Sequence, residues 1–122
     1  MPGKDITYSP AQLDERLQQL PGWNYAEGAI RRAYETSGWP VTLMLVNAIG
    51  FCAEAANHHP DLTVSWGRVV VALSTHSAGG VTEKDLELAR KCDEVALWRP
   101  APNAALTATP EPLVRGGSGS DG

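Results

Sequence analysis

The chain is poor in phenylalanine, cysteine and basic residues. Phe51 is its one phenylalanine, and Cys52 and Cys92 are its two cysteines. A disulfide would need an oxidising compartment, so we expect two buried thiols in a reducing cytoplasm. The net charge is −4 and the pI is about 5.2. Because no basic patch stands out, direct nucleic-acid binding is not expected.

Long apolar runs are also missing. The longest apolar segment, 41–56, is interrupted by Thr42, Asn47, Gly50 and Glu54, and it is short for a helix that crosses a bilayer. Near the beginning of the chain, Lys4–Asp5 is followed by no apolar run, so no secretory signal is expected. We therefore expect a cytoplasmic protein with no membrane contact.

The composition changes near Arg99. Up to that point the chain has the apolar content of one small domain, and beyond it four prolines precede a run of glycine and serine. Such a composition is typical of disorder. We expect one domain over residues 1–98 and a Pro/Gly/Ser-rich disordered tail over residues 99–122.

Hydrophobic periodicity and turn signals predict the element order α-β-β-α-β-β-α. Ser9 and Thr82 have the spacing of capping boxes, Ser37 is a candidate cap, and Glu27-Gly28 fits a tight hairpin turn. This pattern indicates an α+β fold, a four-stranded antiparallel sheet with helices packed on one face. The expected elements are a helix from Pro10 to before Pro21, strands 23–26 and 29–35, a helix from 39 or 40 to 57, strands 62–66 and 68–75, and a helix opened by Thr82.

Two features of these elements bear on packing. The arginines of the second strand, Arg31 and Arg32, are expected to point their charges to water. The helix over 41–56 is apolar nearly all round, which is typical of a helix covered on more than one side. A second subunit would provide that cover and would make the protein a homodimer or homotetramer. The other helices of the same chain are the alternative.

All three histidines lie within 19 positions, at His58, His59 and His76. Such a cluster indicates a proton-transfer site or a metal site. Two adjacent histidines and one distant one are not the usual spacing of zinc ligands, and no cysteine is near them in sequence. We therefore favour proton transfer, with no metal and no cofactor.

The spacing of seven residues makes a more specific pattern: an acidic residue, His-His-Pro, an aromatic, a histidine and an aspartate at fixed offsets. The chain carries it as Glu54, His58, His59, Pro60, Trp66, His76 and Asp85. Over residues 23–95 the chain thus resembles the pterin-4a-carbinolamine dehydratases. The resemblance implies a hydro-lyase that converts 4a-hydroxytetrahydropterin to quinonoid dihydropterin in pterin cofactor recycling.

The resemblance also implies roles for the matching residues. His58 and His76 would be the proton-transfer pair and His59 would bind or orient the pterin, while His58 as a simple helix C-terminal cap is the structural alternative. Glu54 would orient His58 or lie in solvent. Asp85 would contact the pterin, orient His76 or cap its own helix. The residues expected at the substrate are Glu54, Pro60, Trp66, Thr75 and Asp85, although an aromatic such as Trp66 is often core.

Three features point to a different role for the same fold. Leu62 stands where many family members have an aromatic, the long helix has a single phenylalanine, and the tail is atypical of the compact enzymes. Some relatives associated with α-carboxysomes assist Rubisco assembly, and one animal relative is also a dimerisation cofactor. A non-catalytic assembly factor, with Rubisco as partner, or an interaction scaffold is therefore the alternative function.

Overall fold

The computed structural model describes residues 6–115 of the protein, and residues 1–5 and 116–122 lie outside this description. Its element order confirms the predicted α+β class. The elements are α1 (Pro10–Arg16), η1 (Leu17–Gln19), β1 (Asn24–Ala26), β2 (Ala29–Thr36), α2 (Trp39–Ala56), β3 (Asp61–Ser65), β4 (Arg68–Leu73), η2 (His76–Ala78), α3 (Glu83–Leu97) and β5 (Val114–Arg115).

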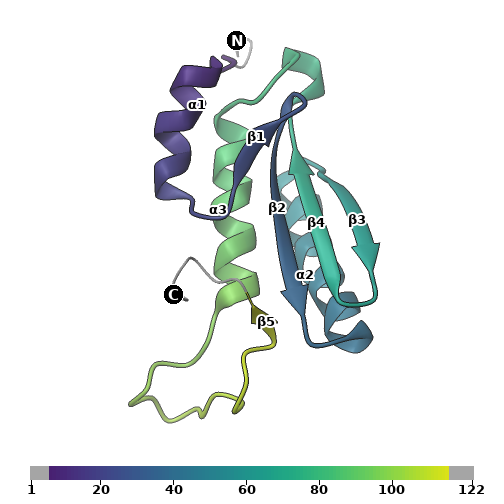
Figure 1. Ribbon diagram of the computed structural model, residues 1–122, viewed down its shortest axis with the longest axis vertical. Coiled ribbons are helices and arrows are strands. Elements are labelled where there is room, and N and C mark those ends of the chain that lie inside the picture. Colours follow the sequence, from purple (N-terminus) through teal and green to yellow (C-terminus); the bar gives the residue numbers. More distant parts are fainter. Residues whose placement is uncertain (1–5, 116–122) are drawn as a thin grey trace.

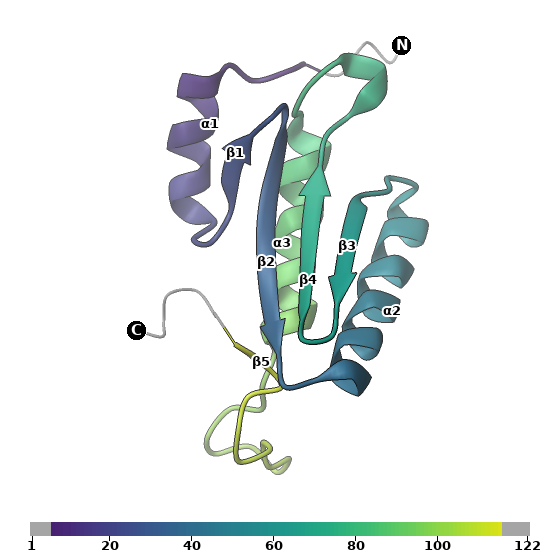
Figure 2. The ribbon, with the colours of Figure 1, turned by 45° about the vertical axis from the view of Figure 1, so that its right-hand side comes forward.

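The sheet is antiparallel in the order β1-β2-β4-β3. β4 is central, with Tyr34 of β2 opposite its Val69 and Leu62 of β3 opposite its Val71. The alternation of the β4 sequence puts Val69, Val71 and Leu73 on one face, where all three are buried, and Ala72 on the other face is buried as well. Figure 2 shows the four strands side by side, with β3 at one edge.

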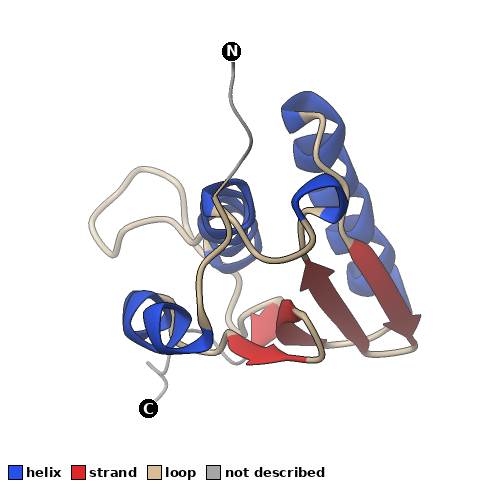
Figure 3. Ribbon diagram, turned by 90° about the horizontal axis from the view of Figure 1, so that it is seen from above, coloured by secondary structure: helices blue, strands red, loops and turns tan. Residues whose placement is uncertain are grey.

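Helices α2 and α3 lie on the same face of the sheet, and α1 lies at the β1 edge (Figure 3). The helices pack on this face because α2 presents Leu45, Ile49 and Ala53 to it and α3 presents Leu86 and Ala89. These side chains and the inward residues of β2 and β4 form one core. The opposite face of the sheet carries no helix in the described chain (Figure 1).

Turn and cap chemistry explain most element ends. The capping box at Ser9 is present, with reciprocal hydrogen bonds to Gln12. Glu27 and Gly28 both have positive φ, 54° and 80°, which is the backbone of a tight hairpin turn. The prediction of Ser37 as a cap is wrong. The N-cap of α2 is Gly38, which provides no side-chain cap.

The expectation that Arg32 points to water is also wrong. Its guanidinium is buried and lies 3.2 Å from Asp93 of α3. The same carboxylate accepts a hydrogen bond from the Tyr34 hydroxyl at 2.5 Å and one from Trp23 Nε1 at 3.2 Å. Burial and this hydrogen bond raise the pKa of Tyr34 above its ordinary value. Arg31, one position earlier, lies on the opposite face and is partly exposed.

Helix α2 is only partly covered. By length and mean hydropathy, 1.4 over 18 residues, it could cross a bilayer. It packs, however, on the sheet and on α3, with Leu45 and Ile49 in the core, as a core helix of an α+β domain does. Met44 and Phe51 remain exposed, Phe51 by 75%. An apolar side of this helix therefore faces outward in the single chain.

The segment after α3 returns to the sheet. Val114 and Arg115 form the short strand β5, which pairs with Thr36 and Glu35 of β2. On the way, this segment lines an apolar cavity of about 430 Å³ against α2 and the end of α3. The sequence predicts no strand here, because two residues carry no periodicity. The rest of the predicted tail, residues 116–122, lies outside the described residues.

Candidate functional site

The site begins where α2 ends. Asn57, the C-cap, has left-handed dihedrals, φ 52° and ψ 43°, and its amide donates to carbonyls of the last turn. The amide of His58 also donates to Ala53 O at 3.0 Å. These bonds turn the chain back over the helix end, and His59 and Pro60 then lead into β3.

The second part of the site is the exit of β4. Asp61 at the start of β3 pairs with Ala72 near the end of β4. The chain therefore leaves β4 at the same end of the sheet at which it enters β3. Thr75 is buried, and its amide donates to Gly80 O at 2.8 Å. This closes a small loop in which His76 begins η2 and is exposed. The loop places His76 on the surface next to buried Thr75.

The third part is the first turn of α3, where Asp85 lies with 0% exposure. Its Oδ2 accepts hydrogen bonds from the Thr82 amide at 2.9 Å and from the Thr75 hydroxyl at 2.8 Å. Its Oδ1 lies 2.6 Å from His58 Nε2. Asp85 therefore caps its own helix, as the spacing predicts, and joins all three parts of the site. The imidazole that it contacts is that of His58 and not that of His76.

His58 is 13% exposed and lines a groove of about 910 Å³ between α2 and α3. Lys84, Glu87 and Lys91 of α3 line the same groove, and Phe51 lies at its α2 side. The sequence pattern gave no reason to include the two lysines. The signal that could have found them is their spacing along α3, since Glu87 lies three residues after Lys84 and four before Lys91, and residues three and four apart share a helix face.

His59 and Glu54 form a separate, exposed pair. His59 Nε2 lies 2.8 Å from Glu54 Oε1, and both side chains are largely exposed. The expectation that Glu54 orients His58 is therefore wrong, because Glu54 contacts His59. The end of α2 explains why Glu54 contacts His59 and not His58, because the left-handed Asn57 turns His58 away from its i−4 neighbour.

The structure does not bring Trp66 to the histidines. It lies in the turn between β3 and β4, at the opposite end of β3 from Pro60, and is 69% exposed. Its ring packs near Gly38, where an added Cβ would lie 3.3 Å from it. Among residues 6–115, no group of three His, Cys, Asp or Glu side chains is placed to hold a metal ion.

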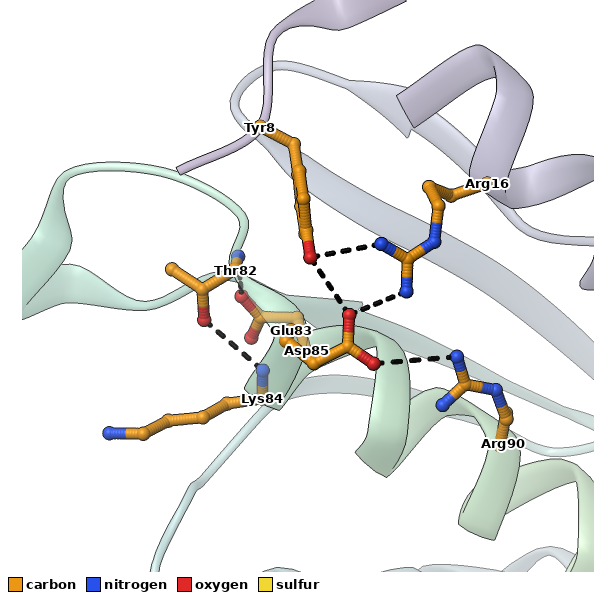
Figure 4. Close-up of polar contacts among 7 residues, drawn as sticks. All are labelled: Tyr8, Arg16, Thr82, Glu83, Lys84, Asp85 and Arg90. Carbon is orange, nitrogen blue, oxygen red and sulfur yellow. Dashed lines mark hydrogen bonds and ion pairs between the residues drawn. The ribbon is translucent and has the colours of Figure 1, made fainter. Parts of the chain in front are cut away.

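Residues outside the histidine site also hold the first turn of α3 in place, through contacts to Glu83 (Figure 4). Glu83 Oε1 accepts hydrogen bonds from the Tyr8 hydroxyl at 2.9 Å and from Arg16 at 2.5 Å, and Oε2 lies 3.5 Å from Arg90. Burial acts to raise the pKa of Glu83, but the hydrogen bonds from Tyr8 and Arg16 and the two guanidinium charges hold it below its ordinary value. The cluster ties the segment before α1 and α1 itself to the turn that carries Asp85.

Fold and site together define a small α+β domain with a histidine site supported by a buried carboxylate. The model of the family "Pterin 4 alpha carbinolamine dehydratase" matches residues 7–95. The chain belongs to this family.

Individual relatives agree with the family match. A protein of Aquifex aeolicus named "Putative pterin-4-alpha-carbinolamine dehydratase" is 44% identical over 87 residues, which cover 71% of this chain and 88% of that protein. A protein of the same name from Nocardia farcinica is 42% identical over 88 residues, 72% of this chain and 93% of that one. The crystal structure of a "transcriptional coactivator/pterin dehydratase" from Brucella melitensis is 31% identical, with a TM-score of 0.71, and covers 75% of this chain and 99% of that one.

Proposed function

We propose that the protein catalyses loss of water from a 4a-hydroxytetrahydropterin to give the quinonoid dihydropterin. The hydroxyl at C4a leaves with a proton supplied by the enzyme, and the proton on N5 goes to a basic group. Two imidazoles in opposite protonation states suit these two transfers, because imidazole titrates near neutral pH. Positioned acid–base groups of this kind contribute about 10²- to 10⁴-fold each.

The observation that carries the proposal is the His58–Asp85 pair, 2.6 Å apart, at the sheet end that also displays His76. A fully buried carboxylate beside a partly exposed imidazole holds that ring in place, as the carboxylate of a catalytic triad does. His58 and His76 are the proposed proton-transfer pair. The exposed His59–Glu54 pair is proposed to bind the pterin.

The remaining matched residues have weaker support as substrate contacts. Pro60 is half-buried at the entry to β3 and can contribute to the pocket wall. Trp66 can contribute only if a second copy of the chain brings its β3–β4 turn to the site. Thr75 is too buried for direct contact, and its role is taken up below. Both cysteines are free thiols, which fits our assignment of the reaction to the cytoplasm.

An assembly or interaction role is the second candidate. The observation in its favour is the apolar surface of α2, where Met44 and Phe51 are exposed, beside a groove that reaches His58. The Brucella structure has a title that names both a coactivator and a dehydratase. A partner such as Rubisco, or a further copy of this chain, would cover that surface.

Stopped-flow dehydration of synthetic 4a-hydroxytetrahydropterin separates the two candidates. The wild-type protein should accelerate the reaction above buffer, and His59→Ala should mainly raise KM. A matched control is Thr63→Ala, an exposed change on β3 outside the site. If wild-type protein at micromolar concentration leaves the buffer rate unchanged, the dehydratase proposal is wrong and the assembly role takes its place.

A further inference from the structure

Within residues 6–115, hydroxyl and amide groups of Thr75, Thr82 and Lys84 form a connected set of hydrogen bonds beside Asp85. The Thr75 hydroxyl donates its single proton to Asp85 Oδ2 at 2.8 Å. Thr75 Oγ1 also lies 2.8 Å from Thr82 Oγ1, and because its own proton is already used, Thr82 must be the donor of that second bond. Thr82 Oγ1 in turn accepts from the Lys84 amide at 3.2 Å.

These bonds form a chain with one direction. It runs from the Lys84 amide to the Thr82 hydroxyl, to the Thr75 hydroxyl and to Asp85 Oδ2. The Thr82 amide adds a second donor to the same oxygen, at 2.9 Å, as the cap in Figure 4 shows. The backbone amide and the hydroxyl that contact the carboxylate thus both donate hydrogen bonds to it, and these bonds stabilise its charged form.

The remaining oxygen, Oδ1, faces His58 Nε2 at 2.6 Å. Imidazole is intrinsically the stronger base of the two groups, and two donors already stabilise the charge on Asp85. The proton between them therefore lies on Nε2. In the neutral ring this leaves Nδ1 as the nitrogen with the free lone pair.

We propose that Thr75 is a positioning residue that acts through Asp85 to hold His58 as the Nε2–H tautomer, so that Nδ1 is the nitrogen that exchanges protons with the ligand. The inference deepens the proposed function and rests on it for the identity of the ligand. Thr75 itself does not touch the ligand, because it is 3% exposed and its proton is committed to Asp85. This explains why a threonine precedes His76. Its backbone closes the η2 loop, and its side chain acts through Asp85 to fix the tautomer of His58.

The variants that test the inference differ in one hydroxyl. Thr75→Val keeps the shape and removes the donor, while Thr75→Ser keeps the donor. Thr42→Val is the matched control, since Thr42 is equally buried and its hydroxyl bonds Thr36 Oγ1 at 2.6 Å and Trp66 O at 2.9 Å, at the far end of α2.

The readout is the ¹⁵N NMR spectrum of the neutral His58 ring, assigned by its loss in His58→Gln. We expect a protonated Nε2 and an unprotonated Nδ1 in the wild type, in Thr75→Ser and in Thr42→Val. In Thr75→Val the Asp85 carboxylate loses the hydroxyl that fixes its orientation toward Nε2, so the two ¹⁵N shifts should move toward each other as both tautomers become populated. The dehydration rate should fall about 10-fold or more in Thr75→Val alone.

A wild-type spectrum with the proton on Nδ1 would overturn the inference, and so would a Thr75→Val spectrum and rate equal to those of the wild type. If Thr75→Val does not fold, Thr75→Cys, whose thiol is a weaker donor, replaces it with the same expected direction. The spectrum needs no substrate. A wild type that dehydrates no pterin but shows the expected tautomer would therefore refute the proposed function and leave the positioning role standing.

Discussion

Replacing Asp93 with asparagine is expected to destabilise the protein by about 3 kcal/mol, because it removes the charge from a carboxylate that is paired with a buried guanidinium. The Asp93 carboxylate lies 3.2 Å from Arg32 Nη1 and accepts hydrogen bonds from Tyr34 and Trp23. The Arg32 side chain is 2% exposed and that of Asp93 is 19% exposed. The partial exposure of Asp93 places the loss at the lower end of the roughly 3–5 kcal/mol typical of a broken buried pair.

The assay is thermal and urea unfolding followed by circular dichroism. At about 4–8 °C per kcal/mol for a domain of this size, Asp93→Asn should lower Tm by roughly 12–24 °C. Arg31→Gln is the control on the same strand, because Arg31 pairs with Glu27 at 3.7 Å on the surface and such pairs contribute about 0–1 kcal/mol. The double variant Arg32→Met/Asp93→Asn should lose less stability than the two single losses added together. An Asp93→Asn variant within about 1 kcal/mol of the wild type would refute the reasoning.

Three further predictions follow from other parts of the molecule. Glu83→Gln should be less stable than the wild type at pH 7, and this difference in unfolding free energy should shrink below about pH 4. A carboxylate with a lowered pKa contributes stability above its unfolded-state pKa and loses that contribution as the pH falls through its folded-state pKa. Urea unfolding at pH 7 and at pH 3.5 checks this. Removal of residues 99–122 should leave a folded domain with Tm lower by no more than about 8 °C. The reason is that β5 adds only a two-residue pairing, and a domain of this size loses about 4–8 °C per kcal/mol. A larger fall in Tm would place the domain boundary beyond Trp98. Light scattering at micromolar concentration should show a dimer or tetramer, and Phe51→Glu should shift it toward smaller species; a wild-type monomer would contradict an interface on α2.

Much of the fold follows from local patterns in the sequence. The alternation of β4 and the capping boxes at Ser9 and Thr82 are local signals, and the structure confirms them. The Arg32–Asp93 pair was not predictable in this way. Its partners lie 61 positions apart, and a strand pattern shows which residues share a face but not whether a helix covers that face with a carboxylate.

The site shows the same division. The spacing of His58, His59, His76 and Asp85 indicated a shared site, but it could not indicate which carboxylate meets which imidazole. That choice depends on the left-handed Asn57, which ends α2 one residue before His58. A single positive φ reverses the direction of the following side chains, and helical periodicity, which put Glu54 and His58 on one face, does not extend past it.

The central claim is that His58 and His76 share proton transfer in pterin dehydration. Stopped-flow rates for His58→Ala, His76→Ala and the double variant test it most directly. Each single change should lower the rate by about 10²-fold or more, and the double change should lower it by less than the product, because groups that act as a unit are not additive. A His58→Ala protein that keeps the wild-type rate, while Asp85 and the fold remain intact, would contradict the account.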